Sequence, residues 1–258
     1  MNGIVIDINA DLGESAVRLA NGADFELMRH TTSANVACGG HAGDAETMKR
    51  TIEFAKELGV AVGAHPSYPD RVNFGRVTMS MNANDLETAV RRQIEELARV
   101  ARGLGVELRQ VKPHGALYYA ASQDREVARA VGRAAQAIHP RLVMIGQAES
   151  ASLEVWREMG LRCAGEAFAD RTYERDGALR SRTLAGAVLE EPARAARQAV
   201  DIAMRHVVAT ADGTEAPLAA ETICIHSDTR NAAVIARAVR EGLKAAGVEV
   251  QALEYFRG

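Results

Sequence analysis

Ionisable and polar side chains collect directly after the short, β-branched runs of this 258-residue sequence. Four of its seven histidines belong to this pattern, together with carboxylates, amides and cationic side chains. Carboxylates and imidazoles can take up and deliver protons, and Lys or Arg can hold a carboxylate or a phosphate. The pattern therefore predicts an active site. The residues concerned are Asp7, Asn9, Asp11, Glu14, Asn35, Cys38, His41, Asp44, His65, Asp70, Lys112, His114, Glu166, Asp170, Arg171, His226 and Asp228.

Three of these histidines, His41, His65 and His114, follow successive predicted strands and have carboxylates close by in the sequence. If they converge in the fold, they can hold a divalent metal ion, and the ligand types suit Zn²⁺ or Mn²⁺. The same side chains can equally act without a metal, as acid and base around a carbonyl substrate. No HExxH motif is present to decide between the two interpretations.

Short apolar runs are predicted to form the strands that position these side chains. They are Ile4–Ile8, Ser33–Ala37, Val60–Ala64, Leu108–Lys112, Leu142–Ile145, Leu161–Ala167, Thr222–Ile225 and a candidate last strand, Val248–Leu253. Amphipathic helical stretches lie between them, and Asn84 and Asp124 are predicted to cap two of the helices. Pro192 is expected in the first turn of a helix over Ala193–Val207, and another helix is expected over Ala232–Ala246.

The regular alternation of strands and helices predicts an α/β fold in which residues 1–258 form a single domain with a parallel sheet. A closed or nearly closed (β/α) barrel is favoured over an open doubly wound sheet, because no GxGxxG motif follows any strand. In such a barrel the carboxyl ends of the strands meet on one face, where the polar residues would gather. The irregular stretch Asp170–Leu189 is long enough to be functional, and Asp212-Gly213 predicts a surface hairpin turn.

The composition excludes several classes of protein. The formal net charge is −3 and no run of Lys and Arg is present, so we expect no nucleic-acid partner. No apolar stretch approaches the roughly 18 residues that cross a bilayer, so we expect no membrane association. Acids stand near the N-terminus where a secretion signal would have bases. The three cysteines show no CxxC spacing, which is typical of a reduced, cytoplasmic protein.

Six sequence strings in collinear order resemble the LamB/YcsF family. They are NADLGES, TSANVACGGHAGD, GVAVGAHPSYPDRVNFGR, VKPHGALYY, EAFADRTY and TICIHSD. The resemblance covers Ile4 to Ala246. It implies a (β/α) barrel distorted to about seven strands and related to the glycoside hydrolase and deacetylase barrels. It also implies cleavage of 5-oxoproline to L-glutamate coupled to ATP hydrolysis, in concert with two partner subunits, B and C. The departures from the usual pattern affect only the local shape near the second and seventh strands, and they are Ala10, Gly40, Ser227 and Asn231.

The implied reaction assigns roles to the predicted site. Asp11 is expected to act as general base, with Glu14 or His114 as its proton partner. Lys112 is expected to stabilise charge on an oxyanion or phosphate. The residues expected to position the substrate are Asn9, Asn35, Asp44, Arg76, Tyr118, Glu166, Arg171 and His226. The sequence contains no GxxxxGK[ST] loop, so ATP with its Mg²⁺ is expected to be handled largely by the partner subunits.

Two other functions stay open at the level of sequence. One is a stand-alone metal-dependent deacetylase or amidohydrolase, which tightly bound Zn²⁺ or Mn²⁺ and turnover without ATP would favour. The other is a non-catalytic regulatory protein that binds a lactam or a sugar. Binding without turnover, even in the presence of subunits B and C, would favour this second alternative.

Overall fold

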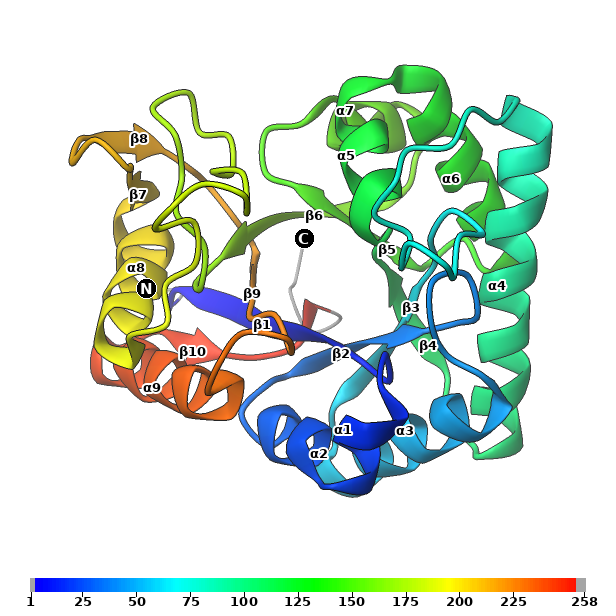
Figure 1. Ribbon diagram of the computed structural model, residues 1–258, viewed down its shortest axis with the longest axis horizontal. Helices are drawn as coiled ribbons and strands as arrows, with labels where there is room; N and C mark the ends of the chain where they lie inside the picture. Colours follow the sequence, from blue (N-terminus) through cyan, green and yellow to red (C-terminus); the bar gives the residue numbers. More distant parts are fainter. Residues whose placement is uncertain (1–2, 254–258) are drawn as a thin grey trace.

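The strands are short and buried on both faces, as parallel strands covered by helices must be. The computed structural model, which describes residues 3–253, shows seven of them closing into a parallel barrel (Figure 1). In order around the ring they are β1 (Val5–Leu12), β2 (Ser33–Ala37), β3 (Ala61–His65), β4 (Leu108–Val111), β5 (Val143–Gln147), β6 (Arg162–Phe168) and β9 (Thr222–Cys224). Strand β9 pairs with β1 and closes the ring, and β10 (Glu249–Val250) pairs with the first residues of β1.

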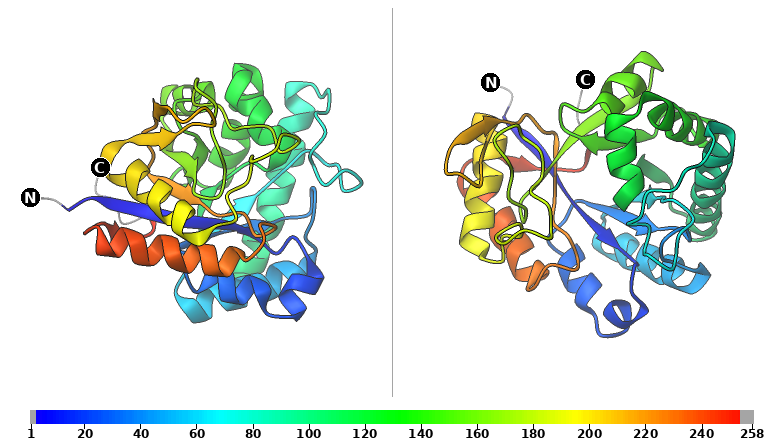
Figure 2. Two further views of the ribbon diagram at one scale, coloured as in Figure 1. Left: turned by 60° about the vertical axis from the view of Figure 1, so that its left-hand side comes forward. Right: turned by 45° about the horizontal axis from the view of Figure 1, so that its top comes forward.

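Nine helices within residues 3–253 surround the barrel. They are α1 (Ala16–Ala20), α2 (Ala23–Met28), α3 (Ala45–Leu58), α4 (Ala83–Gly103), α5 (Gly115–Gln123), α6 (Arg125–Ile138), α7 (Ala151–Glu158), α8 (Pro192–Arg205) and α9 (Ala232–Ala245). Figure 2 shows α8 and α9 side by side on the outside of the barrel, where they pack against each other. In the part of the chain that the structure describes, no helix combines the length and the apolar character that crossing a membrane requires.

The predicted distorted α/β barrel with about seven parallel strands is confirmed. The largest error in a strand boundary lies at the first strand, which does not end at Ile8 but continues to Leu12. Its last residues pair with β2, with Asp11 opposite Asn35. Polar residues at this point predicted a loop, but they alternate with buried Ala10 and Leu12 in the period of a strand. The carboxylate of Asp11 is therefore held by a strand and not by a flexible turn.

The helix caps were predicted in part. Asp124 caps α6 as expected, but the prediction that Asn84 caps α4 is wrong. Asn82 occupies that position, and its side-chain oxygen accepts a hydrogen bond from the backbone N–H of Asp85 at 3.0 Å. The expected hairpin turn at Asp212-Gly213 joins the antiparallel strands β7 (Val207–Ala209) and β8 (Glu215–Pro217).

The long segment between β6 and α8, the β6–α8 insertion, folds back over the end of the barrel. Isolated bridges pair Arg171 with Val188 and Tyr173 with Leu179, so the segment is ordered without forming a regular element. The hydroxyl of Tyr173 accepts a hydrogen bond from the backbone N–H of Phe168 at 2.7 Å, which ties the insertion to the end of β6. The insertion forms one wall of a cavity at this end of the barrel.

Candidate active site

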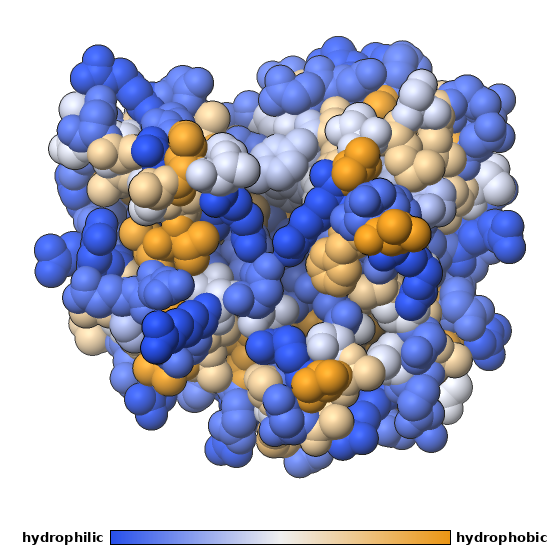
Figure 3. Space-filling model, in the orientation of Figure 1, coloured by the Kyte–Doolittle hydropathy of each residue, from blue (hydrophilic) through white to orange (hydrophobic). Residues whose placement is uncertain are grey.

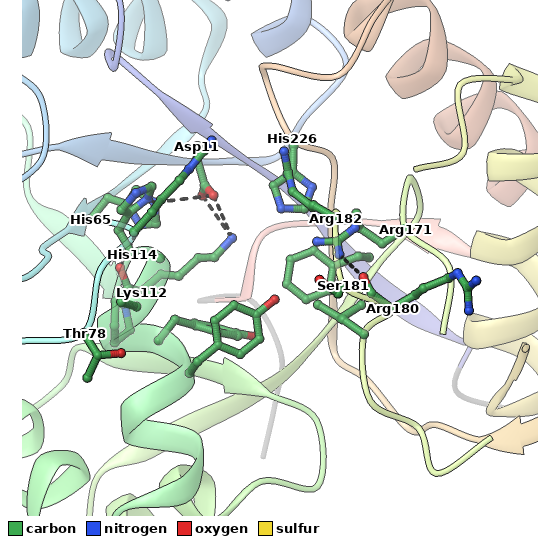
Figure 4. Close-up of a pocket in the computed structure, with 18 residues that line it drawn as sticks. Asp11, His65, Thr78, Lys112, His114, Arg171, Arg180, Ser181, Arg182 and His226 are labelled. Carbon is green, nitrogen blue, oxygen red and sulfur yellow. Dashed lines mark hydrogen bonds and ion pairs between the residues drawn. The ribbon is translucent and has the colours of Figure 1, made fainter. Parts of the chain in front are cut away.

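The cavity has a volume of about 490 Å³ and opens where the carboxyl ends of the strands meet. Figure 3 shows a hollow near the centre of this face, bordered by hydrophilic side chains. Figure 4 shows Asp11, His65, Lys112 and His114 gathered on one side of the cavity. Arg171, Arg182 and His226 lie on the opposite side, so carboxylate, imidazole and cationic groups all face the same space.

Most of the predicted site residues converge at this cavity. Those that line it are Asp11, His65, Arg76, Lys112, His114, Tyr118, Arg171 and His226. Glu14 and His41 lie directly behind His65 and His114, and Asn9, Asn35 and Glu166 are connected to Asp11 or Lys112 by hydrogen bonds or ion pairs. Asp44 does not line the cavity: it is exposed, and its side chain caps α3 in a capping box with Thr47. The sequence placed Asp44 after a strand, where a helix cap and a substrate ligand look alike.

Lys112 is the charged centre of the site. Its Nζ lies 3.0 Å from Asp11 Oδ1 and 2.8 Å from Glu166 Oε1, and it donates a hydrogen bond to Cys224 Sγ at 3.2 Å. Burial alone would lower the pKa of Lys112, but Asp11, Cys224 and Glu166 raise it well above its ordinary value. Lys112 therefore carries a fixed positive charge beside the cavity.

The carboxylate of Asp11 is held by two hydrogen-bond donors and lies beside an imidazole nitrogen. Asn35 Nδ2 and Lys112 Nζ each donate at 3.0 Å, and His65 Nε2 lies 3.4 Å from Oδ2. Burial would raise the pKa of Asp11, but the charges of His65 and Lys112 lower it well below its ordinary value. A carboxylate with so low a pKa is a weak proton acceptor. These surroundings favour a role as counter-charge for Lys112, and the expected role of Asp11 as general base stays a prediction.

The interior of the barrel below Lys112 is polar and hydrogen-bonded. Asn9 Nδ2 donates to Glu166 Oε1 at 2.9 Å and to Thr222 Oγ1 at 2.7 Å. Glu166 Oε2 and the hydroxyl of Tyr118 are buried, and neither makes a hydrogen bond of good geometry among residues 3–253. Burial and the neighbouring charge of Glu166 raise the pKa of Tyr118, so its hydroxyl stays protonated. Such polar atoms beside a cavity are suited to a polar ligand.

Three histidines and a glutamate pack together behind Asp11. One atom from each of Glu14, His41, His65 and His114 lies within 4.8 Å of the other three. Burial lowers the pKa of His41 to about 2, and burial with the charge of His65 lowers the pKa of His114 to about 3. Burial raises the pKa of Glu14. His41 and His114 are therefore neutral imidazoles at neutral pH.

Arginines of the β6–α8 insertion supply a cationic wall that the sequence did not predict. Arg180 and Arg182 line the cavity beside the predicted Arg171 and Arg76. Arg171 is buried and donates to the backbone carbonyls of Ala187 and Arg180, so it also fixes the insertion. Arg76 and Arg182 both pair with Asp228, at 2.9 and 3.0 Å. The sequence signal for this wall is weak: several arginines lie in the insertion, but their spacing does not tell which of them face the cavity.

His226, in the segment after strand β9, is the last of the predicted residues that line the cavity. His226 Nδ1 lies 3.0 Å from Asp170 Oδ1, and its ring stacks on Phe168 with centroids 5.1 Å apart. The side chain is thus oriented by a buried carboxylate and an aromatic face, and it lines the cavity.

The fold and the site together define a (β/α)-barrel protein with a pocket of charged and polar side chains at the carboxyl ends of its strands. The chain belongs to the LamB/YcsF family, whose model matches residues 6–258. It is 50% identical over 246 residues to the A subunit of 5-oxoprolinase from Chloroflexus aggregans, covering 95% of this chain and 98% of that one.

Solved structures show the same fold. The crystal structure of the lactam utilization protein from Thermus thermophilus superimposes with a TM-score of 0.90 at 42% sequence identity, covering 96% of this chain and 100% of that one. The T48 deacetylase solved with substrate has a TM-score of 0.52 at 13% identity, covering 98% of this chain and 89% of that one. The second likeness shows a shared barrel fold and nothing about chemistry.

Proposed function

We propose that this chain is the A subunit of an ATP-dependent 5-oxoprolinase, which opens the lactam of 5-oxoproline to give L-glutamate while ATP is converted to ADP and phosphate. The name of the Chloroflexus aggregans relative supports this function. The structural observation that carries it is the buried cation Lys112, held between two carboxylates at the edge of a cavity with arginines opposite. That arrangement matches a small substrate with one carboxylate and one amide carbonyl.

The chemistry of the lactam explains why ATP is needed. An amide nitrogen is a poor leaving group, and transfer of the γ-phosphoryl group to the lactam oxygen makes the ring carbon electrophilic. Water then adds to that carbon, the C–N bond breaks, and the nitrogen takes a proton, which leaves the acyl phosphate of glutamate. A second water molecule hydrolyses this acyl phosphate to glutamate and inorganic phosphate, so the reaction consumes one ATP and two water molecules.

The side chains of the cavity have distinct roles in this proposal. Lys112 stabilises negative charge on the lactam oxygen or on the transferred phosphoryl group. Asp11 keeps Lys112 charged and in place, which is a positioning role. Arg76 and Arg182 hold the substrate carboxylate. Proton transfer to and from water is assigned to the cluster behind Asp11, of which His65 and His114 line the cavity.

The partners complete the site for ATP. The sequence has no GxxxxGK[ST] loop, which is the motif that cradles nucleotide phosphates in many enzymes. Subunits B and C therefore supply most of the nucleotide site in this proposal, and the barrel supplies the lactam site. The isolated chain is expected to show little or no ATP-dependent cleavage of 5-oxoproline.

The test is an assay of glutamate and ADP release from 5-oxoproline and ATP. The chain is assayed alone, then with purified subunits B and C, and subunits B and C are assayed without it. Glutamate release that requires all three subunits and ATP is the expected result. Full turnover by the chain alone contradicts the need for partners. Failure of the complete mixture to release glutamate overturns the proposed function.

The same assay separates the two alternative functions. Hydrolysis of an amide or acetyl ester without ATP is the result expected of a stand-alone deacetylase or amidohydrolase, which the barrel and the histidine cluster would accommodate. Tight binding of 5-oxoproline without release of glutamate in the complete mixture is the result expected of a regulatory lactam-binding protein.

A further inference from the structure

Backbone carbonyls fix the tautomers of two histidines in the cluster behind Asp11. His65 Nδ1 lies 2.8 Å from the carbonyl oxygen of Lys112, and His114 Nε2 lies 3.0 Å from that of Phe74. A carbonyl oxygen can only accept a hydrogen bond, so each of these nitrogens carries a proton. In the neutral rings, the remaining nitrogens are unprotonated, and they face each other at only 3.0 Å.

Two further atoms with lone pairs, one from Glu14 and one from His41, lie close to these two nitrogens. Glu14 Oε1 lies 3.3 Å from His114 Nδ1 and 2.9 Å from His41 Nε2, and it is 3.8 Å from His65 Nε2. The rings of His41 and His114 stack with centroids 3.6 Å apart, which brings both nitrogens beside the same carboxylate oxygen. His41 Nε2 can donate a hydrogen bond to Glu14, but the facing lone pairs of neutral His65 and His114 have no donor between them and repel one another unless a cation lies there.

The spacing matches a particular kind of cation. Ligand atoms around a four-coordinate Zn²⁺ at about 2.0–2.1 Å from the metal are roughly 3.3 Å from one another. Three contacts within the cluster are close to this size, at 2.9, 3.0 and 3.3 Å, and all the ligand atoms lie within 4.8 Å of one another. Three imidazoles favour Zn²⁺ over Mn²⁺ or Mg²⁺, which prefer oxygen ligands.

The surroundings have the features of a metal site. The carbonyls of Lys112 and Phe74 orient His65 and His114 through their outer nitrogens, as the neighbours of metal-bound histidines do. The ring of Phe74 packs edge-on against His41 and His114, with centroids 5.1 and 5.3 Å away, and shields the cluster from water.

The local charge also favours a divalent ion. The carboxylates of Asp11 and Glu166 flank Lys112, and Glu14 lies among the three histidines. With the histidines neutral, three carboxylates face one lysine in a largely buried region, where an uncompensated charge is costly.

We propose that Glu14, His41, His65 and His114 form a binding site for one divalent metal ion of the zinc type. The competing arrangement is a proton shared by His65 and His114, with Asp11 as the counter-ion of the imidazolium. This alternative predicts no stoichiometric binding of metal.

The experiment measures metal binding by the purified full-length chain. The chain is stripped with a chelator, dialysed against ZnCl₂ and then against metal-free buffer, and its zinc content is measured by elemental analysis. Affinity is measured by calorimetric titration with ZnCl₂, and the visible spectrum is recorded after substitution with CoCl₂. Three cluster variants are tested: Glu14→Gln, His41→Ala and His114→Ala. The matched control is His139→Ala, because His139 is exposed and lies at the end of α6, outside the cluster. Circular dichroism establishes that each variant is folded.

One zinc ion per wild-type chain and per His139→Ala chain is the expected result, with a cobalt spectrum of four-coordinate type. Each cluster variant is expected to lose at least about 100-fold in zinc affinity, since even the loss of a residue that only orients a ligand costs about 10–100-fold. Glu14→Gln preserves the shape of the cluster and tests the site even if a histidine variant does not fold. Absence of stoichiometric zinc in the wild-type chain overturns the proposal, as does a Glu14→Gln variant that binds zinc like the control. Because no substrate, ATP or partner is present, this outcome is independent of the 5-oxoprolinase assay.

Discussion

Lys112 and Asp11 show how the surroundings of a residue decide its chemistry. Both were assigned to catalysis from the sequence, one as a cation and the other as a base. Inside the barrel, each stabilises the charged form of the other, which raises the pKa of Lys112 and lowers that of Asp11. The pair is therefore a fixed dipole beside the cavity, and such preorganised charge is often the largest contribution to catalysis.

Replacement of Asp11 by Asn tests the positioning role. The amide keeps the shape of the side chain but removes the counter-charge of Lys112, so we expect kcat of the assembled complex to fall by about 10²–10³-fold with little change in KM. Steady-state glutamate release measures both constants. Asp201→Asn, in α8 and outside the lining of the cavity, should behave like the wild type. Wild-type kcat in Asp11→Asn would remove the residue from the mechanism.

Asp7 lies deeper in the barrel and controls stability instead. Burial raises its pKa to about 6, although Thr222, Thr32 and Ser33 donate hydrogen bonds to it. A folded-state pKa above the unfolded value favours the protonated form, so the contribution of Asp7 to stability is full below about pH 4 and is lost as the pH rises through 6. The difference of about two pKa units corresponds to about 3 kcal/mol.

The Asp7→Asn variant isolates this effect, since its side chain stays neutral at every pH. Urea unfolding of the two proteins between about pH 4 and pH 8 should show the variant gaining about 3 kcal/mol relative to the wild type over that range. The comparison cancels the titration of all other groups. If the difference in the free energy of unfolding between the two proteins does not change with pH, the pKa of Asp7 is not raised by folding.

At the scale of elements, the strands were predictable and the loops between them were not. Ser33–Ala37 was predicted without error, because a glycine pair, Gly39-Gly40, marks the loop that follows it closely. Helices α1 and α2 were missed, since they are short and carry no long amphipathic stripe. The cationic wall was missed because Arg180 and Arg182 reach the cavity through non-local packing of the insertion, which no local pattern encodes.

The loop that carries His41 depends on Gly43. Its φ is +88°, and a Cβ there would lie within 2.4 Å of the carbonyl oxygen of Ala37. Gly59, at the end of α3, also has positive φ, but nothing lies within 4 Å of its Cβ position. Gly59→Ala should therefore lower the free energy of unfolding by about 1–2 kcal/mol through backbone conformation alone. Gly43→Ala should lower it clearly more, because the added Cβ would also clash. Chemical denaturation measures the free energy of unfolding of both variants. Equal losses of stability would show that the structure accommodates the Cβ at position 43 without further destabilisation.

The β6–α8 insertion is expected to contribute binding rather than chemistry. Arg182 faces the cavity, whereas Arg175 of the same insertion pairs with Asp212 on the surface. A charge that holds the substrate carboxylate equally in the ground and transition states affects mainly KM. We expect Arg182→Gln to raise KM for 5-oxoproline by about 10-fold, with kcat within a few-fold of the wild type and Arg175→Gln unchanged. A large fall in kcat at unchanged KM would place Arg182 in the chemical step instead.

At the scale of the whole molecule, the barrel brings residues from the first and last strands to one cavity. Asp11 on β1 lies beside Lys112 at the end of β4, and His226 after β9 lies across from them. The sequence predicted this convergence, because a closed parallel barrel gathers the carboxyl ends of its strands. It did not predict the contacts between the gathered side chains, which pair Asp11 with Lys112 and unite Glu14 with three histidines.

A substitution of Lys112 tests most directly whether the lactam is cleaved in this cavity. The measurement is ATP-dependent glutamate release from 5-oxoproline by the complex with subunits B and C, containing either Lys112→Met or the exposed control Lys49→Met. Size-exclusion chromatography first establishes that both variants assemble like the wild type. We predict a fall of at least about 100-fold for Lys112→Met and wild-type release for Lys49→Met. Glutamate release at the wild-type rate by the assembled Lys112→Met complex would contradict a catalytic role for this cavity.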